Sequence, residues 1–438
     1  MRMRGWLAVG FFMCCSLGFA KGAINARFLD ALSETGVISK MDADAVKKES
    51  SSIELLLPQA EPQLRTFLIL QNRYTYAQHT YCNAANSSQS RFDIRRLIPV
   101  FIANPTENTS VFVAVYLPSD MPINSAFATF NFESEYVCGT FKAGFLGPNF
   151  SMEEPDSCTN LYTPDRNILC LYFGGGDGGI DGYRKTAYGT SLGFSGSHPG
   201  IYFDGYLPTH KEYVYQLGFS NSKNDALTIR RDNGVIVWLM LGYEKKFEDF
   251  SVKFGSNFGY STKSVSAIAG GASLPSEIVD CGDLYGIDPY FRLATEKFTL
   301  QLEYMMAKVQ YGKTKSDLIP TYTTSSGYAD PHGFSAMVAY KLFDLGKLGK
   351  LEPIFRYTYL NTDGKGVREC DVAYKSPNAG GLFNKAHAYY AGINWYIRGR
   401  YLKYAMGIEH LDFQDSPMGL DKGSASSDIV IGQLQVMF

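Results

Sequence analysis

Apolar and polar residues alternate along most of the chain from residue 62 onward. Near residue 300, for example, Leu302 and Tyr304 alternate with Gln301 and Glu303. Successive side chains of a β-strand point to opposite faces, so this alternation predicts strands with one apolar and one polar face. The pattern recurs in many consecutive segments separated by turn residues, which predicts a large antiparallel sheet.

The alternation delimits seventeen candidate strands. Most of them are long enough to cross a bilayer at a tilt, which takes about 9–11 residues. A closed barrel made by one bacterial chain normally has an even number of strands, so we expect about sixteen, or else eighteen. The candidates are residues 66–77, 91–102, 110–118, 125–137, 139–147, 185–195, 198–207, 210–220, 233–246, 250–262, 285–296, 298–311, 333–343, 350–361, 385–397, 400–412 and 428–438.

The two ends of the chain indicate export. Residues 1–20 combine the cationic Arg2 and Arg4 with a short apolar run and small residues, which predicts a signal peptide cleaved after residue 20 or 22. Residues 23–61 show a short helical pattern and then a polar stretch, so we expect a helical extension in the periplasm before a barrel at 62–438. The last strand ends on Phe438, and an aromatic carboxyl terminus is usual for outer-membrane barrels.

Hydropathy is consistent with a membrane barrel. Beyond the signal peptide, no apolar stretch approaches the roughly 18 residues of a membrane helix. A barrel alternates lipid-facing and lumen-facing residues, so its mean hydropathy stays near neutral, and here it is -0.13. A soluble β-sandwich shows the same alternation but buries its apolar faces against each other. With the two chain ends, the pattern favours an all-β transmembrane antiparallel barrel in the bacterial outer membrane, in contact with its lipid.

Charge and cysteine content exclude some functions. The formal net charge is -2, or -4 once Arg2 and Arg4 are removed with the signal peptide, which argues against a nucleic-acid partner. No CxxC or Cys/His spacing suits zinc and no nucleophile motif is present, so we expect no metal, no cofactor and no enzyme. Cysteines of an exported chain tend to pair, and Cys158 with Cys170 would close a local loop. The sequence does not determine the remaining pairs.

Several segments resemble the phosphate-selective porin O and P family. They are residues 27–39, like the short helix before the barrel, 64–77 and 92–97, like early strands, 139–167, like a strand and its following loop, and 431–438, like the last strand. The resemblance implies a homotrimer of about sixteen-stranded barrels, each with a pore narrowed by inward-folded loops. The family's expected ladder of alternating arginines is not found, since the chain has no R-x-R-x-R run.

The loop at 148–168 is the best candidate for a constriction, because it follows an early strand and carries charges of both signs. Opposite charges across a narrow aqueous passage create a transverse field that orients polar solutes. An acidic loop that is merely solvated outside the barrel remains the alternative. Arg95 and Arg96 are adjacent on a strand and should point to opposite faces, and we expect Arg95 to face inward. The expected pore-lining residues are Arg95, Glu133, Glu135, Lys142, Glu153, Glu154, Asp156 and Arg166.

These observations predict a passive porin. Small hydrophilic solutes and ions would cross a water-filled lumen down their gradients. We expect weak selectivity and no strong anion preference, because the net charge without the signal peptide is -4 and no arginine ladder exists. Two alternatives remain open: a surface antigen or adhesin barrel with a blocked lumen, and an outer-membrane enzyme, for which we find no catalytic set.

Overall fold

The computed structural model describes residues 63–81, 87–117, 123–135, 137–155, 158–174, 192, 194, 197–221, 235–261, 265–267, 278–280, 283–310, 328–363, 367–368, 382–415 and 424–438. The expected signal peptide and helical extension lie outside these residues. So does most of the candidate strand at 185–195, of which only Leu192 and Phe194 are described.

Sixteen principal strands form one sheet in the described part of the chain, which confirms the smaller of the two expected numbers. The short strands β14 (Tyr328–Ala329) and β16 (Phe343–Asp344) extend the same sheet. The principal strands are β1 (Gln63–Tyr81), β2 (Ser87–Thr106), β3 (Thr109–Val115), β4 (Ile123–Glu133), β5 (Cys138–Leu146), β6 (His198–Leu207), β7 (His210–Asn221), β8 (Val235–Lys246), β9 (Phe250–Ser261), β12 (Leu284–Thr295), β13 (Phe298–Gln310), β15 (His332–Tyr340), β17 (Lys350–Asn361), β20 (Lys385–Tyr396), β21 (Leu402–Gln414) and β22 (Ala425–Met437).

The last strand closes the sheet on the first. β22 pairs antiparallel with β1 from Ile69 opposite Met437 to the far ends of both strands. At the junction the Leu68 amide donates to the Phe438 carbonyl at 2.6 Å, and the Phe438 amide donates to the Leu68 carbonyl at 3.1 Å. The sheet is therefore a closed antiparallel barrel, in which neighbouring strands satisfy each other's backbone groups as a bilayer requires.

The apolar rows of the strands face outward. On β13, Leu302, Tyr304 and Met306 are between 40% and 46% exposed, whereas the intervening Gln301 and Glu303 are buried in the interior. β15 and β22 show the same division. This arrangement is the opposite of a soluble sandwich, which would bury the apolar rows, and it confirms the predicted barrel.

The chain divides into two compact units. The larger comprises Phe67–Val100 and Val113–Phe438 and holds the closing pair of strands. The smaller includes Phe101–Phe112, where the hydroxyls of Thr106 and Thr109 form a 2.7 Å hydrogen bond across the turn between β2 and β3.

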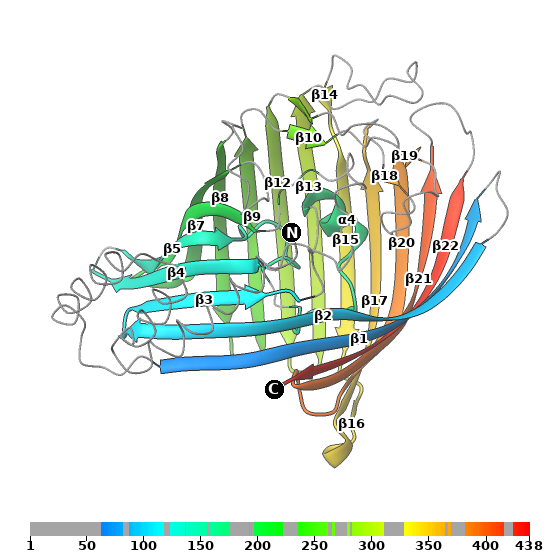
Figure 1. The fold of residues 1–438 in the computed structure, drawn as a ribbon, viewed down its shortest axis with the longest axis horizontal. Coiled ribbons are helices and arrows are strands. Elements are labelled where there is room, and N and C mark those ends of the chain that lie inside the picture. The colour runs from blue at the N-terminus through cyan, green and yellow to red at the C-terminus, as the bar shows by residue number, and fades with distance from the viewer. Residues whose placement is uncertain are drawn as a thin grey trace, which may run out of the picture. The chain divides into compact units, whose positions relative to one another are not determined.

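The connections differ at the two ends of the strands. At the end where β22 finishes, only Pro208 and Thr209 separate β6 from β7, and only Glu296 and Lys297 separate β12 from β13. At the other end several connections are much longer, and they include the short elements β10 (Val265–Ala267), β11 (Ile278–Asp280), β18 (Val367–Arg368), β19 (Leu382–Phe383) and α4 (Ile168–Gly174). Figure 1 labels β10, β18, β19 and α4. Short turns of such barrels face the periplasm, which places Phe438 on that side.

A charge on the outward row should destabilise the barrel according to its depth. Ile408 lies at the middle of β21 and is 57% exposed on the outer face, so Ile408→Arg should cost about 2–4 kcal/mol of unfolding free energy in vesicles. Asp412→Arg, in the same outward row near the strand end, should cost about 0–1 kcal/mol. Guanidinium unfolding of the vesicle-inserted protein measures both, and equal costs would contradict a lipid-facing row.

Candidate constriction site

The segment at 147–174, called here the inserted segment, follows β5, and its described residues (147–155 and 158–174) fold into the interior of the barrel. Phe150, Leu169 and Phe173 on this segment are 0–1% exposed although they belong to no strand of the sheet. α4 ends the segment and lies against β15 and β17 (Figure 1). The segment therefore occupies part of the lumen instead of extending into solvent.

Two carboxylates on the wall hold the start of the inserted segment. Asp288 of β12 accepts a hydrogen bond from the Ser151 amide at 2.8 Å, and Glu303 of β13 accepts one from the next amide, of Met152. Asn257 of β9 also donates to the Asp288 carboxylate, at 2.7 Å. Ser151 has a φ of 78°, a left-handed conformation that can turn successive amides toward one anion-binding site. Asp288 and Glu303 therefore form a carboxylate clamp on this part of the backbone.

Side chains from other strands bond the rest of the segment's backbone. An unpaired peptide group is costly where water is excluded, so these bonds let an irregular segment cross the barrel. The donor and acceptor pairs are Asn149 N to Gln216 Oε1 (2.9 Å), Gln71 Nε2 to Cys158 O (3.2 Å), Gln435 Nε2 to Thr159 O (3.2 Å), Lys403 Nζ to Leu161 O (2.7 Å) and Asn394 Nδ2 to Tyr162 O (2.9 Å).

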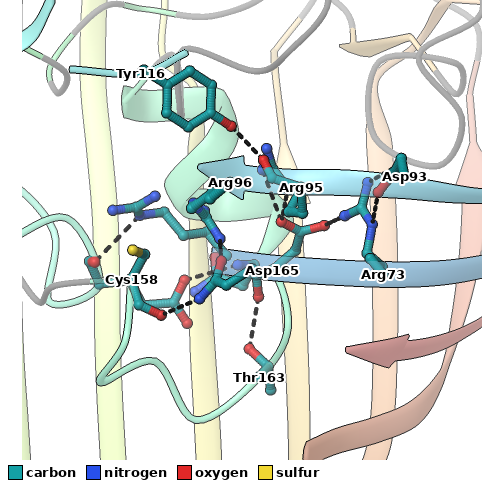
Figure 2. A network of polar contacts seen from close by, with 12 residues as sticks. Arg73, Asp93, Arg95, Arg96, Tyr116, Cys158, Thr163 and Asp165 are labelled. Carbon is teal, nitrogen blue, oxygen red and sulfur yellow. Dashed lines mark hydrogen bonds and ion pairs between the residues drawn. The ribbon is translucent and has the colours of Figure 1, made fainter. Parts of the chain in front are cut away.

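Asp165 of the inserted segment lies between two arginines of the wall (Figure 2). It forms ion pairs with Arg73 of β1 and with Arg95 of β2, the latter at 2.9 Å between Nη2 and Oδ1. Arg73 also pairs with Asp93 of β2 at 3.2 Å. Bonds between ionised groups are stronger than neutral ones, so this cluster fixes the segment against β1 and β2.

A second cluster surrounds Arg356 of β17. Its guanidinium pairs with Glu153 of the inserted segment at 3.3 Å and with Glu409 of β21 at 3.0 Å. It also donates to the Thr163 hydroxyl at 2.6 Å and lies 5.4 Å from the Tyr390 ring centre. This cluster joins two parts of the inserted segment, at Glu153 and at Thr163, to β17 and β21.

Four of the expected pore-lining residues belong to these clusters or adjoin them. Arg95 and Glu153 are described above, and Arg166 pairs with Glu154 at 3.3 Å within the segment. The side chains of Glu153 and Glu154 are only 12% and 11% exposed, so they do not belong to a solvated external loop.

The expectation that only one of Arg95 and Arg96 faces inward is wrong. Both are buried, and Arg96 donates to Gln71 at 2.7 Å while Arg95 reaches Asp165. Along β2 the buried positions change phase between these two residues, and Ile98 then continues the phase of Arg96. A one-residue irregularity of this kind turns adjacent side chains to the same face.

Other expected residues lie elsewhere. Glu133 and Glu135 are exposed at the hairpin turn between β4 and β5, at the opposite end of β5 from the inserted segment, so they do not join the site. Lys142 forms an ion pair with Asp204. Asp204 in turn accepts a 2.5 Å hydrogen bond from Gln216, and Gln216 accepts one from the Asn149 amide of the inserted segment. Asp156 lies outside the described residues.

The expected disulfide is absent: Cys158 and Cys170 are free thiols. The chain between them is bonded to β22, β21 and β20 in turn, which holds Cys158 near β1 while Cys170 lies on α4. Burial, followed by the nearby negative charge of Glu154, raises the pKa of the Cys170 thiol well above its ordinary value.

Aromatic side chains gather on another side of the inserted segment. Phe150 stacks on Phe194 with ring centres 4.6 Å apart, and both rings contact the inward-facing Trp238 of β8. Gly286 on β12 makes room for Phe194, since a Cβ there would overlap its ring. The inserted segment thus has an apolar side, which contacts Trp238, and a charged side, which contacts β1, β2 and β17.

Apart from Arg95, sequence reasoning did not select the residues of the wall that hold the segment. Glu303 and Arg356 are charged residues at inward positions in the middle of strands. A charge at such a position was the sequence signal that could have identified them. Among the described residues no cluster of three or more His, Cys, Asp or Glu could hold a metal ion, and no helix is long and apolar enough to cross a membrane.

Solved structures similar in fold to this chain include a porin and an outer membrane channel. The anion-selective porin from Comamonas acidovorans matches with a TM-score of 0.54 at 10% identity, covering 86% of this chain and 100% of its own. The outer membrane channel DcaP of Acinetobacter baumannii gives 0.52 at 10% identity, covering 87% and 99%, and Salmonella typhi OmpF in complex with daunomycin gives 0.51 at 12%, covering 86% and 97%. At these identities the likeness shows the fold alone.

No curated protein matches the sequence significantly. The family model described as phosphate-selective porin O and P matches residues 103–438, which is most of the barrel and the whole inserted segment. This match confirms the resemblance seen in the sequence. The chain belongs to the phosphate-selective porin O and P family.

Proposed function

We propose that the inserted segment and the wall residues that hold it form the constriction of the channel, and that this constriction is only weakly selective for charge. The protein is an outer-membrane porin, through which small hydrophilic solutes and ions diffuse passively. The observation that carries the proposal is the arrangement around Asp165, where cations of the wall and an anion of the segment neutralise each other within one cross-section.

Charge neutralisation at this cross-section supports weak selectivity. Arg73, Arg95 and Arg356 would attract anions if they faced open water, but each is nearly buried and paired with a carboxylate. A ring of one sign biases ion choice, whereas paired charges mainly orient polar solutes. The family's name therefore does not imply strong phosphate selectivity for this chain.

The proposal includes a homotrimer and excludes covalent chemistry. Trimers are implied by the family resemblance. The charged residues of the interior support positioning rather than catalysis, since Asp165, Glu153 and the Asp288–Glu303 clamp each bond the segment or an arginine that holds it.

Single-channel recording of the full chain in planar bilayers tests the proposal. We expect stable conductance steps and a small reversal potential under a potassium chloride gradient. If no conductance steps were observed, the lumen would be blocked and the protein would not be an open channel. Near-exclusive passage of chloride or phosphate would contradict weak selectivity.

Removing the charge of Asp165 should make the channel prefer anions. In Asp165→Asn, Arg73 and Arg95 lose their shared carboxylate, so the ratio of anion to cation permeability should rise about two- to fivefold. The matched control is Asp428→Asn, which removes the same charge from the outer face of β22 and should leave the ratio unchanged. Equal ratios in both variants would show that Asp165 does not border the conducting path.

Loss of the carboxylate clamp should loosen the inserted segment. Asp288→Ala together with Glu303→Ala leaves the Ser151 and Met152 amides without these acceptors, at a cost of about 1–3 kcal/mol each. We expect larger and noisier open-channel currents. Gln301→Ala is the control, because this inward residue of β13 bonds Arg292 instead of the segment. Currents as quiet as those of the wild type would mean that other contacts suffice to hold the segment.

A further inference from the structure

The connection between β15 and β17 differs from the other turns at the periplasmic end. Residues 341–349 separate these strands, whereas two residues separate β6 from β7 and β12 from β13. β16 and the 3₁₀ helix η2 (Gly346–Leu348) give this connection, called here the β16 turn, an ordered structure of its own, and Figure 1 shows it extending past the neighbouring turns.

Three leucines of the β16 turn are exposed at intervals of three residues. Leu342, Leu345 and Leu348 are 50%, 42% and 63% exposed. A 3₁₀ helix repeats every three residues, so Leu345 and Leu348 share one edge. Leu342 continues the outward row of β15, which includes Tyr340. The exposed leucines are thus continuous with the lipid-facing surface of the barrel.

The β16 turn is bonded to the outer surface of the wall. Trp395 lies in the outward row of β20, and its indole N–H donates to the Leu348 carbonyl at 2.6 Å. Gly349, with a φ of 95°, approaches β20 so closely that a Cβ there would overlap the Tyr396 carbonyl oxygen. These contacts hold the turn on the lipid side of the strands and away from the mouth of the lumen.

Cationic residues alternate with these leucines. Lys341, Lys347 and Lys350 are exposed, and Asp344 is the one acidic residue between 341 and 350, which leaves a formal charge of +2 (three minus one). Lys350 pairs with Asp344 at 3.4 Å across the turn, and Lys341 donates to the Glu296 carbonyl at 3.1 Å. Long cationic side chains beside apolar ones are typical of segments at a membrane surface, where the ammonium group reaches the headgroups.

We propose that the β16 turn is an interfacial anchor that rests on the periplasmic leaflet of the outer membrane. Its leucines lie at the boundary of the acyl chains, its lysines contact the phosphates of glycerophospholipids, and Trp395 fixes the turn at the level of the headgroups. Continuity with the lipid-facing wall and the positive charge of the turn favour a phospholipid surface over a protein partner. Tryptophan and tyrosine are enriched at this level of membrane proteins.

Photo-crosslinking in the outer membrane identifies what the turn touches. The full chain is produced with p-benzoylphenylalanine in place of Leu348 in cells whose phospholipids carry ³²P, and it is then irradiated. Retention of the folded form in unheated electrophoresis confirms that the barrel is intact. We expect ³²P to remain on the denatured protein and to be released by phospholipase. The matched control carries the photoreactive residue in place of Glu135, an exposed residue of the polar β4–β5 turn, and should retain about fivefold less label.

Other products at position 348 would overturn the proposal. A crosslink to a second copy of the chain or to a periplasmic protein would make the turn a protein-binding surface. If the protein labelled at position 348 retained no more ³²P than the protein labelled at position 135, the leucines would be in water and the proposal would be wrong.

A second arm tests the lysines. The position-348 protein, refolded into phosphatidylcholine vesicles with or without phosphatidylglycerol, should crosslink lipid more strongly when the anionic lipid is present. The gain should fall about fivefold or more in the triple variant Lys341→Gln, Lys347→Gln and Lys350→Gln, since each lysine near an anionic surface strengthens binding. An equal gain in both proteins would contradict the role of the lysines.

Discussion

Satisfaction of backbone hydrogen bonds by the protein itself is the constraint on which this structure depends. Between strands the closed sheet meets the constraint by pairing, including the junction of Leu68 with Phe438. The inserted segment has no strand partner, so side chains of the wall serve its amides and carbonyls instead. The polar rows of the strands therefore do more than face water, because they determine where an irregular segment can cross the lumen.

The same requirement explains the charges of the interior. Buried ions are costly unless they are paired and hydrogen-bonded. Arg73, Arg95 and Arg356 each meet this condition through carboxylates that the inserted segment or an adjacent strand provides. The apolar contact of Phe150 with Trp238 supports the segment on its other side. In the proposed constriction the charges are thus paired within one cross-section and do not form a continuous ladder of one sign.

The strands and their outward faces could be predicted from sequence because a two-residue alternation is local information. The inserted segment could also be selected, since its charges follow an early strand. The partners of those charges could not be assigned, because Arg356 and Glu153 are far apart in sequence and meet only in the closed barrel. The direction of Arg96 was predicted wrongly because a local irregularity of β2 reverses the alternation. The predicted disulfide between Cys158 and Cys170 was wrong because side chains of three strands hold the chain between the two cysteines.

Amide hydrogen exchange of the membrane-embedded protein tests most directly whether wall side chains hold the inserted segment inside the barrel. Peptides that cover residues 147–174 should exchange nearly as slowly as peptides from β13 and β17, because the amides of Ser151 and Met152 donate to buried carboxylates. Exchange as fast as that of an exposed surface turn would show that the segment is solvated, and the account of the constriction would then be wrong.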